Sequence, residues 1–185
     1  MMEWLGWSHF RFTTPSGTVV QINPFTTNPD SPIAASAITK ANLIFVADGH
    51  PDKQGATVEI AQATGATVFA PGELGTWMVE RDRPQVVPFA APGDKITGGG
   101  VVARMVESVH STGLPQPSAT IPYGGIAAGV FLTFENGYTV YFRGFSPRYG
   151  GAGALGRNVQ AKFDYPAHER PPRSNRYCHA GKASS

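Results

Sequence analysis

The chain has 185 residues and a formal net charge of +2 at pH 7, and 15% of its residues are charged. Its single cysteine, Cys178, excludes an internal disulfide and a zinc site built from thiolates. The apolar runs are too short to span a membrane, and the N-terminus lacks the basic start and apolar stretch of a signal peptide. We therefore expect a cytoplasmic protein.

The charge is unevenly distributed along the chain. Residues 1–146 contain 8 basic and 11 acidic side chains, whereas residues 147–185 contain 7 basic and 2 acidic ones. We divide the chain into a domain over 1–146 and a mobile, basic tail over 147–185, because the tail is rich in Gly, Pro and Arg and has few apolar residues to offset its ordering entropy. The tail has no dense block of Lys and Arg, so we expect neither nucleic acid nor a membrane as partner.

Alternating apolar residues and turn signals predict short strands and two helices. In chain order the predicted elements are strands over 3–13, 18–22 and 42–47, a helix over 54–64, a strand over 66–70, a helix over 72–80, a strand over 101–109 and a hairpin over 129–142. The strand over 66–70 is expected to run parallel to the strand over 42–47, because the connection between them is helical. In the first strand His9 alternates with Phe10, so we expect His9 to face solvent.

Four ionisable residues follow the strand over 42–47 within a short loop: Asp48, His50, Asp52 and Lys53. In α/β proteins, a loop held by a rigid sheet edge is where catalytic and binding residues concentrate. The spacing Asp-x-His-x-Asp-Lys is similar to a two-metal motif, His-x-His-x-Asp-His. The residues alone leave simpler interpretations open: Asp52 also suits a helix N-cap, Lys53 a solvated surface position, and the histidines local hydrogen bonds.

A set of further motifs occurs in a recognisable order over residues 3–146. These are Trp4-Leu5-Gly6, Asn23-Pro24-Phe25, the loop over 48–55, Thr64-Gly65-Ala66 and Glu73-Leu74. Together they resemble the metallo-β-lactamase superfamily, in particular a branch of small bacterial metal-dependent hydrolases related to sugar-phosphate lactonases. The resemblance implies an α/β layered fold, the αββα sandwich, here truncated to its N-terminal half, with metals held by loops at one edge of two sheets.

The metal motif implied by this resemblance is only partly retained. His50, Asp52 and His110 match its positions, whereas Asp48 stands in place of the first ligand histidine and Lys53 in place of the last. Two departures flank the site: Trp7 replaces a histidine and Asn23 replaces an aspartate, and we expect both to line the substrate site. A further ligand, a bridging aspartate, is replaced by Phe145. The family pattern stops within residues 143–147, as a truncation or a shifted reading frame would produce.

The remaining residues can support one metal ion. Asp48, His50 and His110 offer one carboxylate and two imidazoles, which suit a single divalent ion, zinc first and iron or manganese as alternatives. We expect Asp52 to orient or deprotonate a metal-activated water. Since a protonated lysine offers no lone pair, Lys53 cannot be a ligand, and its ammonium is expected to stabilise an oxyanion instead.

Two functional classes follow from these residues. The first is a metal-dependent hydrolase of a small ester or lactone. The second is a catalytically inactive or truncated relative that binds a small ligand or a partner. In either case, a sandwich without its second half exposes sheet edges and apolar faces, so we expect a homo-oligomer.

Overall fold

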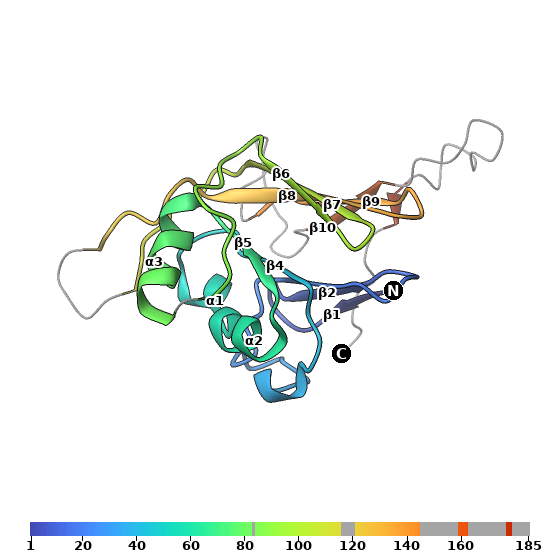
Figure 1. Ribbon diagram of the computed structural model, residues 1–185, viewed down its shortest axis with the longest axis horizontal. Helices are drawn as coiled ribbons and strands as arrows, with labels where there is room; N and C mark the ends of the chain where they lie inside the picture. Colours follow the sequence, from blue (N-terminus) through green and yellow to red (C-terminus); the bar gives the residue numbers. More distant parts are fainter. Residues whose placement is uncertain (83, 116–120, 145–158, 163–176, 179–185) are drawn as a thin grey trace.

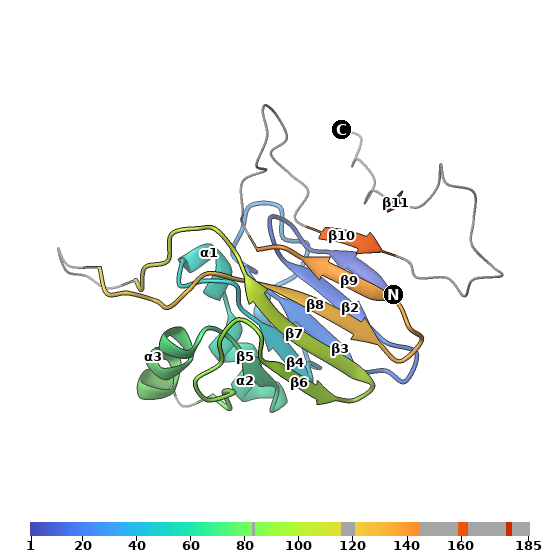
Figure 2. The same ribbon diagram turned by 90° about the horizontal axis from the view of Figure 1, so that it is seen from above.

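Two β-sheets stacked as layers form the body of the protein, and helices lie at one side of the first sheet (Figures 1 and 2). The computed structural model describes residues 1–185 except 83, 116–120, 145–158, 163–176 and 179–185. The first sheet has the order β1 (Met2–Trp4), β2 (Phe10–Thr13), β3 (Val19–Ile22), β4 (Leu43–Phe45) and β5 (Thr67–Phe69). The second has the order β11 (Tyr177–Cys178), β10 (Val159–Lys162), β9 (Thr139–Phe142), β8 (Ala128–Phe134), β7 (Val101–Glu107) and β6 (Lys95–Gly98).

The helices follow from the two α/β steps in the sequence. They are the 3-10 turn η1 (Ala35–Ala37), α1 (Pro51–Gln54), α2 (Thr57–Thr64) and α3 (Gly72–Asp82). The predicted helix over 54–64 is wrong at its start, because Gly55, with φ of +46°, separates α1 from α2. In the part of the chain that is described, no helix has the length and apolar character needed to cross a membrane.

Strand pairing agrees with the predicted α/β steps and corrects the first strand. β3 pairs in parallel with β4, and β4 in parallel with β5, as the helical connection requires. Residues 3–13, however, form two antiparallel strands, β1 and β2, instead of one. The chain reverses between them, where the amides of Leu5 and His9 donate to the carbonyls of His9 and Gly6, each at 2.9 Å.

Two apolar clusters hold the layers together. Between the sheets, the ring of Phe45 lies 6.1 Å from that of Phe69 and 6.4 Å from that of Phe142. On the other face of the first sheet, Ile44 packs in a cluster with Ile60 of α2 and other helical residues. The described residues thus form helical, sheet and sheet layers of an αββα sandwich, and the second helical layer is not among them.

The basic tail enters the second sheet at two short strands. The backbone of β10 pairs antiparallel with β9, and β11 with β10. The other residues of 147–185, apart from these strands, lie outside the described residues, as does Phe145. The division at residue 146 and the mobility of the tail therefore stay predictions.

His9 is completely buried, so the expectation that it faces solvent is wrong. Its Nε2 lies 3.0 Å from Oε1 of Gln21, and its Nδ1 has no hydrogen-bond partner within the described part of the chain. Burial lowers the pKa of His9 to about 4; the Gln21 hydrogen bond opposes this shift, and the charge of Arg11 adds to it. His9 lies in the chain reversal before β2 and not in the strand, so its alternation with Phe10 does not decide its exposure.

We expect acid to destabilise the fold through His9. Its pKa is about 4 in the folded protein and about 6.5 in the unfolded chain, so the unfolded chain binds more protons between these values. The free energy of unfolding therefore falls as the pH falls from 6.5 to 4, by roughly 3 kcal/mol in total. Urea denaturation of metal-free protein across this range measures the effect. His9→Gln should flatten the pH dependence, and an equal slope in both proteins would assign the acid sensitivity to other groups.

Candidate metal centre

The ends of two strands, one from each sheet, bring three metal-ligating side chains together. Asp48 and His50 follow β4, and His110 follows β7. One ligand atom from each lies within 4.8 Å of the others. The predicted convergence of Asp48, His50 and His110 is therefore present, although the three positions span more than sixty residues of sequence.

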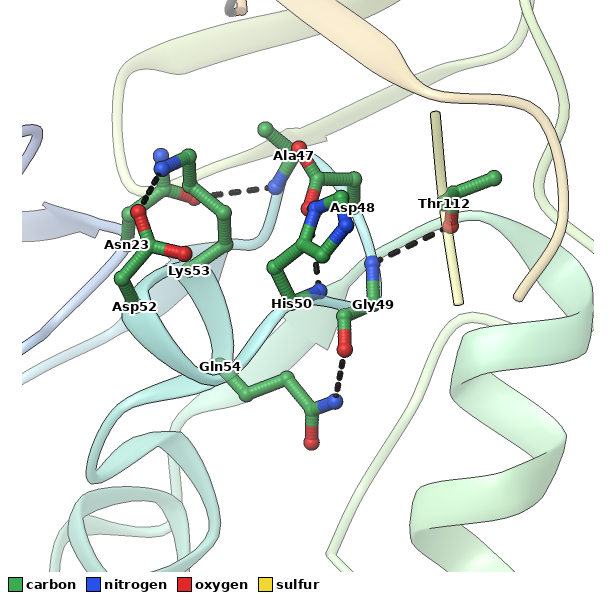
Figure 3. A network of polar contacts seen from close by, with 9 residues as sticks. All are labelled: Asn23, Ala47, Asp48, Gly49, His50, Asp52, Lys53, Gln54 and Thr112. Atoms are coloured by element: carbon green, nitrogen blue, oxygen red, sulfur yellow. Dashed lines mark hydrogen bonds and ion pairs between the residues drawn. The ribbon is translucent and has the colours of Figure 1, made fainter. Parts of the chain in front are cut away.

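Asp48 is the buried centre of this group, with 1% of its surface exposed. Its Oδ1 accepts a hydrogen bond from the backbone amide of His50 at 3.0 Å and lies 2.7 Å from the Nδ1 of the same residue (Figure 3). Its Oδ2 has no hydrogen-bond partner among the described residues. A buried carboxylate oxygen without a partner is costly, and a bound cation would satisfy it.

The two imidazoles are close to one another and to this carboxylate. The ring centroids of His50 and His110 lie 5.1 Å apart, with planes inclined at 49°. The pKa of His110 is lowered, foremost by burial, while the charge of Asp48 opposes the shift and the charges of His50 and Lys53 add to it. The lowered pKa favours the neutral imidazole, which is the form that binds metal. The donor set of one carboxylate and two imidazoles therefore fits a divalent ion such as zinc.

Close backbone approach lets the two ligand loops meet. A Cβ atom on Gly49 would lie 2.8 Å from the carbonyl oxygen of Gly113, so only glycine fits between Asp48 and His50. The amide of Gly49 donates to Oγ1 of Thr112 at 3.2 Å, and Gln54 donates to the Gly49 carbonyl at 2.5 Å (Figure 3). Gln54 and Thr112 thus hold Gly49 in place between Asp48 and His50, a role that the sequence interpretation missed. Gln54 lies within the motif loop, and Thr112 lies two residues after His110. These positions are the signal that could have identified them.

Lys53 and Asp52 form an ion pair on α1, in the same loop region as Asp48 and His50 (Figure 3). Lys53 is only 3% exposed, so a solvated surface position is wrong for it. His50 is the N-cap residue of α1 and Asp52 lies in its first turn, so Asp52 is not the N-cap. Both charges act on the pKa of His110, which places the pair within electrostatic reach of the centre.

Asn23 and Trp7 occupy different surroundings. Asn23 is completely buried, and its Oδ1 accepts a hydrogen bond from the amide of Ala47 at 2.9 Å (Figure 3). A side chain without exposed surface cannot touch a substrate in this conformation, so Asn23 supports the backbone just before Asp48. Trp7 is 52% exposed and packs edge-on against Phe25, with ring centroids 5.5 Å apart. This exposure leaves Trp7 available to a ligand.

Known proteins with similar sequences are metal-dependent hydrolases. The chain is 33% identical over 144 residues to a UPF0173 metal-dependent hydrolase of Koribacter versatilis, covering 77% of this chain and 61% of the relative. It is also 33% identical over 149 residues to a UPF0173 metal-dependent hydrolase of Anaeromyxobacter dehalogenans, covering 77% of this chain and 54% of the relative. The chain thus spans little more than half the length of these relatives. No protein-family model matches it.

Solved structures share the fold. The metallo hydrolase Igni18 from Ignicoccus hospitalis superimposes with a TM-score of 0.66 at 21% identity, covering 80% of this chain and 61% of that protein. An isothiocyanate hydrolase from Delia radicum gut bacteria gives a TM-score of 0.56 at 12% identity, covering 80% and 63%. These sequence similarities support the predicted resemblance to small bacterial metal-dependent hydrolases of the metallo-β-lactamase superfamily, and the solved structures share the layered fold.

Proposed function

We propose that this protein is a metal-dependent hydrolase of a small ester or lactone, with one zinc ion held by Asp48, His50 and His110. The observation that carries the proposal is the buried, unpartnered Oδ2 of Asp48 next to two imidazoles. The names of the relatives support hydrolysis with a metal. The chain covers only part of those relatives. The activity of the whole protein and its small-molecule substrate are therefore proposed here and are not taken over from the relatives.

Each side chain around the centre has a separate role in the proposed reaction. When bound, the metal supplies a nucleophile near neutral pH by lowering the pKa of a bound water to about 7. The contact between Asp48 and His50 Nδ1 fixes the orientation of the imidazole and leaves Nε2 as the ring nitrogen that would bind the metal. Asp52 is half-buried and accepts a proton from the attacking water. The Lys53 ammonium holds the Asp52 carboxylate and, because it is buried, acts through its charge and not through contact on the negative charge that develops on the carbonyl oxygen of the substrate.

Metal removal and replacement test this proposal. Protein dialysed against a chelator should lose hydrolysis of esters and lactones, and about one equivalent of zinc per chain should restore it, because the described residues contain one such ligand set. Metal content is measured by elemental analysis and turnover by a panel of simple esters and lactones. Protein that binds no zinc, iron or manganese and turns over none of the panel would support the alternative of a non-catalytic scaffold.

A further inference from the structure

A hollow of about 570 Å³ lies between α3 and the loops that approach it. Apolar side chains, among them Trp77, Phe89, Leu114 and Ile126, line much of it. In Figures 1 and 2, α3 lies at the same end of the molecule as α1. The metal-ligand residues do not line this hollow, and the mechanism above does not use it.

Leu114 joins the hollow to the metal-ligand loop. Its side chain is buried and lines the hollow, and a Cβ atom on Gly49 would lie 3.2 Å from Leu114 Cδ2. Gly49 stands between the ligands Asp48 and His50. Leu114 therefore lies against both the hollow and Gly49, so the hollow is a neighbour of the loop that carries Asp48 and His50.

The charge of the lining selects the kind of group that fits. Its ionisable residues are Glu73 and Glu80, and no lysine or arginine is among the described residues that line it. An anionic group would meet these two carboxylates, and the guanidinium of Arg81, which stacks on the Trp77 ring at 4.1 Å, offsets only one of the two charges. An uncharged alkyl or aryl group gains from contact with the aromatic and aliphatic lining.

Packing of the core does not explain the exposure and the backbone conformation of Phe89 at the hollow. Its side chain is 83% exposed although it is a large aromatic, and its φ is +52°, where bulky residues are rare. Strained backbone that presents an exposed aromatic side chain is typical of binding sites. The opposite wall is close, because a Cβ atom on Gly72 of α3 would lie 3.0 Å from the Cα of Phe89.

We propose that this hollow binds the uncharged, apolar part of the substrate that does not react, an alkyl or aryl group attached to the ester or lactone. That the bound molecule is a substrate rests on the proposed function, but binding of an apolar group in the hollow does not require turnover. It predicts that neutral esters with longer acyl chains are preferred to short esters, by up to about fourfold per methylene in kcat/KM. It also predicts discrimination against esters whose acyl chain ends in a carboxylate.

A matched pair of fluorescent probes tests binding in metal-free protein. N-phenyl-1-naphthylamine is neutral, and 8-anilinonaphthalene-1-sulfonate is the same ring system with a negative charge. We expect the neutral probe to bind at least about tenfold more tightly, because of the two carboxylates in the lining. Glu73→Gln combined with Glu80→Gln should reduce this difference to about threefold or less. Equal binding of both probes to the unmodified protein would overturn the proposal.

A pair of variants on α3 locates the bound probe. Thr76→Phe adds bulk at an exposed residue that lines the hollow, and Val79→Phe adds similar bulk at an exposed residue of the same helix that does not. Thr76→Phe should weaken the neutral probe at least about tenfold and Val79→Phe should not. If both variants bind alike, the hollow is not the site. Probe binding that Thr76→Phe removes, without any ester hydrolysis by the zinc protein, would reject the proposed function and keep the hollow.

Discussion

Asp48→Asn is expected to lower metal affinity by roughly 100-fold or more and to reduce hydrolysis accordingly. An amide keeps the shape of the side chain and can still accept the bond from the His50 amide. It carries no charge, however, and it places an N–H donor or a neutral oxygen where the unpartnered Oδ2 now lies. The centre would then have to hold a dication with two neutral imidazoles alone.

Metal titration of the purified variant with a competing chelator measures this loss. Glu59→Gln is the matched control, because it removes the same charge from an exposed position on α2. The control should keep the metal affinity and the turnover of the unmodified protein. Unchanged zinc affinity in Asp48→Asn would show that Asp48 is not a ligand.

Lys53→Met is expected to lower kcat by roughly 100-fold to 1,000-fold while zinc stays bound. Methionine is unbranched and fills most of the space of the buried lysine stem, so the variant should fold. The ammonium is lost, and with it the positive charge placed to stabilise the developing oxyanion and to hold Asp52. Because the metal ligands are unchanged, the zinc content separates this role from a general loss of the centre.

The test measures kcat and KM of Lys53→Met and of the unmodified protein, both at full zinc occupancy. A loss confined to KM would mean that Lys53 binds substrate and has no special role in the transition state. Lys40→Met, which replaces an exposed lysine outside the motif loop, is the control and should leave both constants unchanged. Full kcat in Lys53→Met would remove Lys53 from the mechanism.

Local sequence patterns were sufficient for much of the fold. The steps β4–α2–β5 and the hairpin β8–β9 were predicted within a few residues, because apolar periodicity and turn residues act over short distances. The reversal between β1 and β2 is closed by local hydrogen bonds at Gly6 and His9, which apolar alternation does not reveal. The separation of α1 from α2 depends on a distant segment, because the amide of Ala56 donates to the carbonyl of Pro24 at 2.9 Å.

For the candidate site, too, the sequence determined some features and the tertiary structure others. The sequence by itself determined that Asp48 and His50 share one loop, because two residues of spacing after a strand end leave little alternative, and it determined the donor types that suit a divalent metal. For His110 the residues by themselves were not sufficient: the family resemblance implied that it joins them, and the tertiary structure brings it there because Gly49 passes against Gly113. The burial of His9 and Lys53 was likewise decided by packing, because exposure depends on what covers a residue and not on its own side chain.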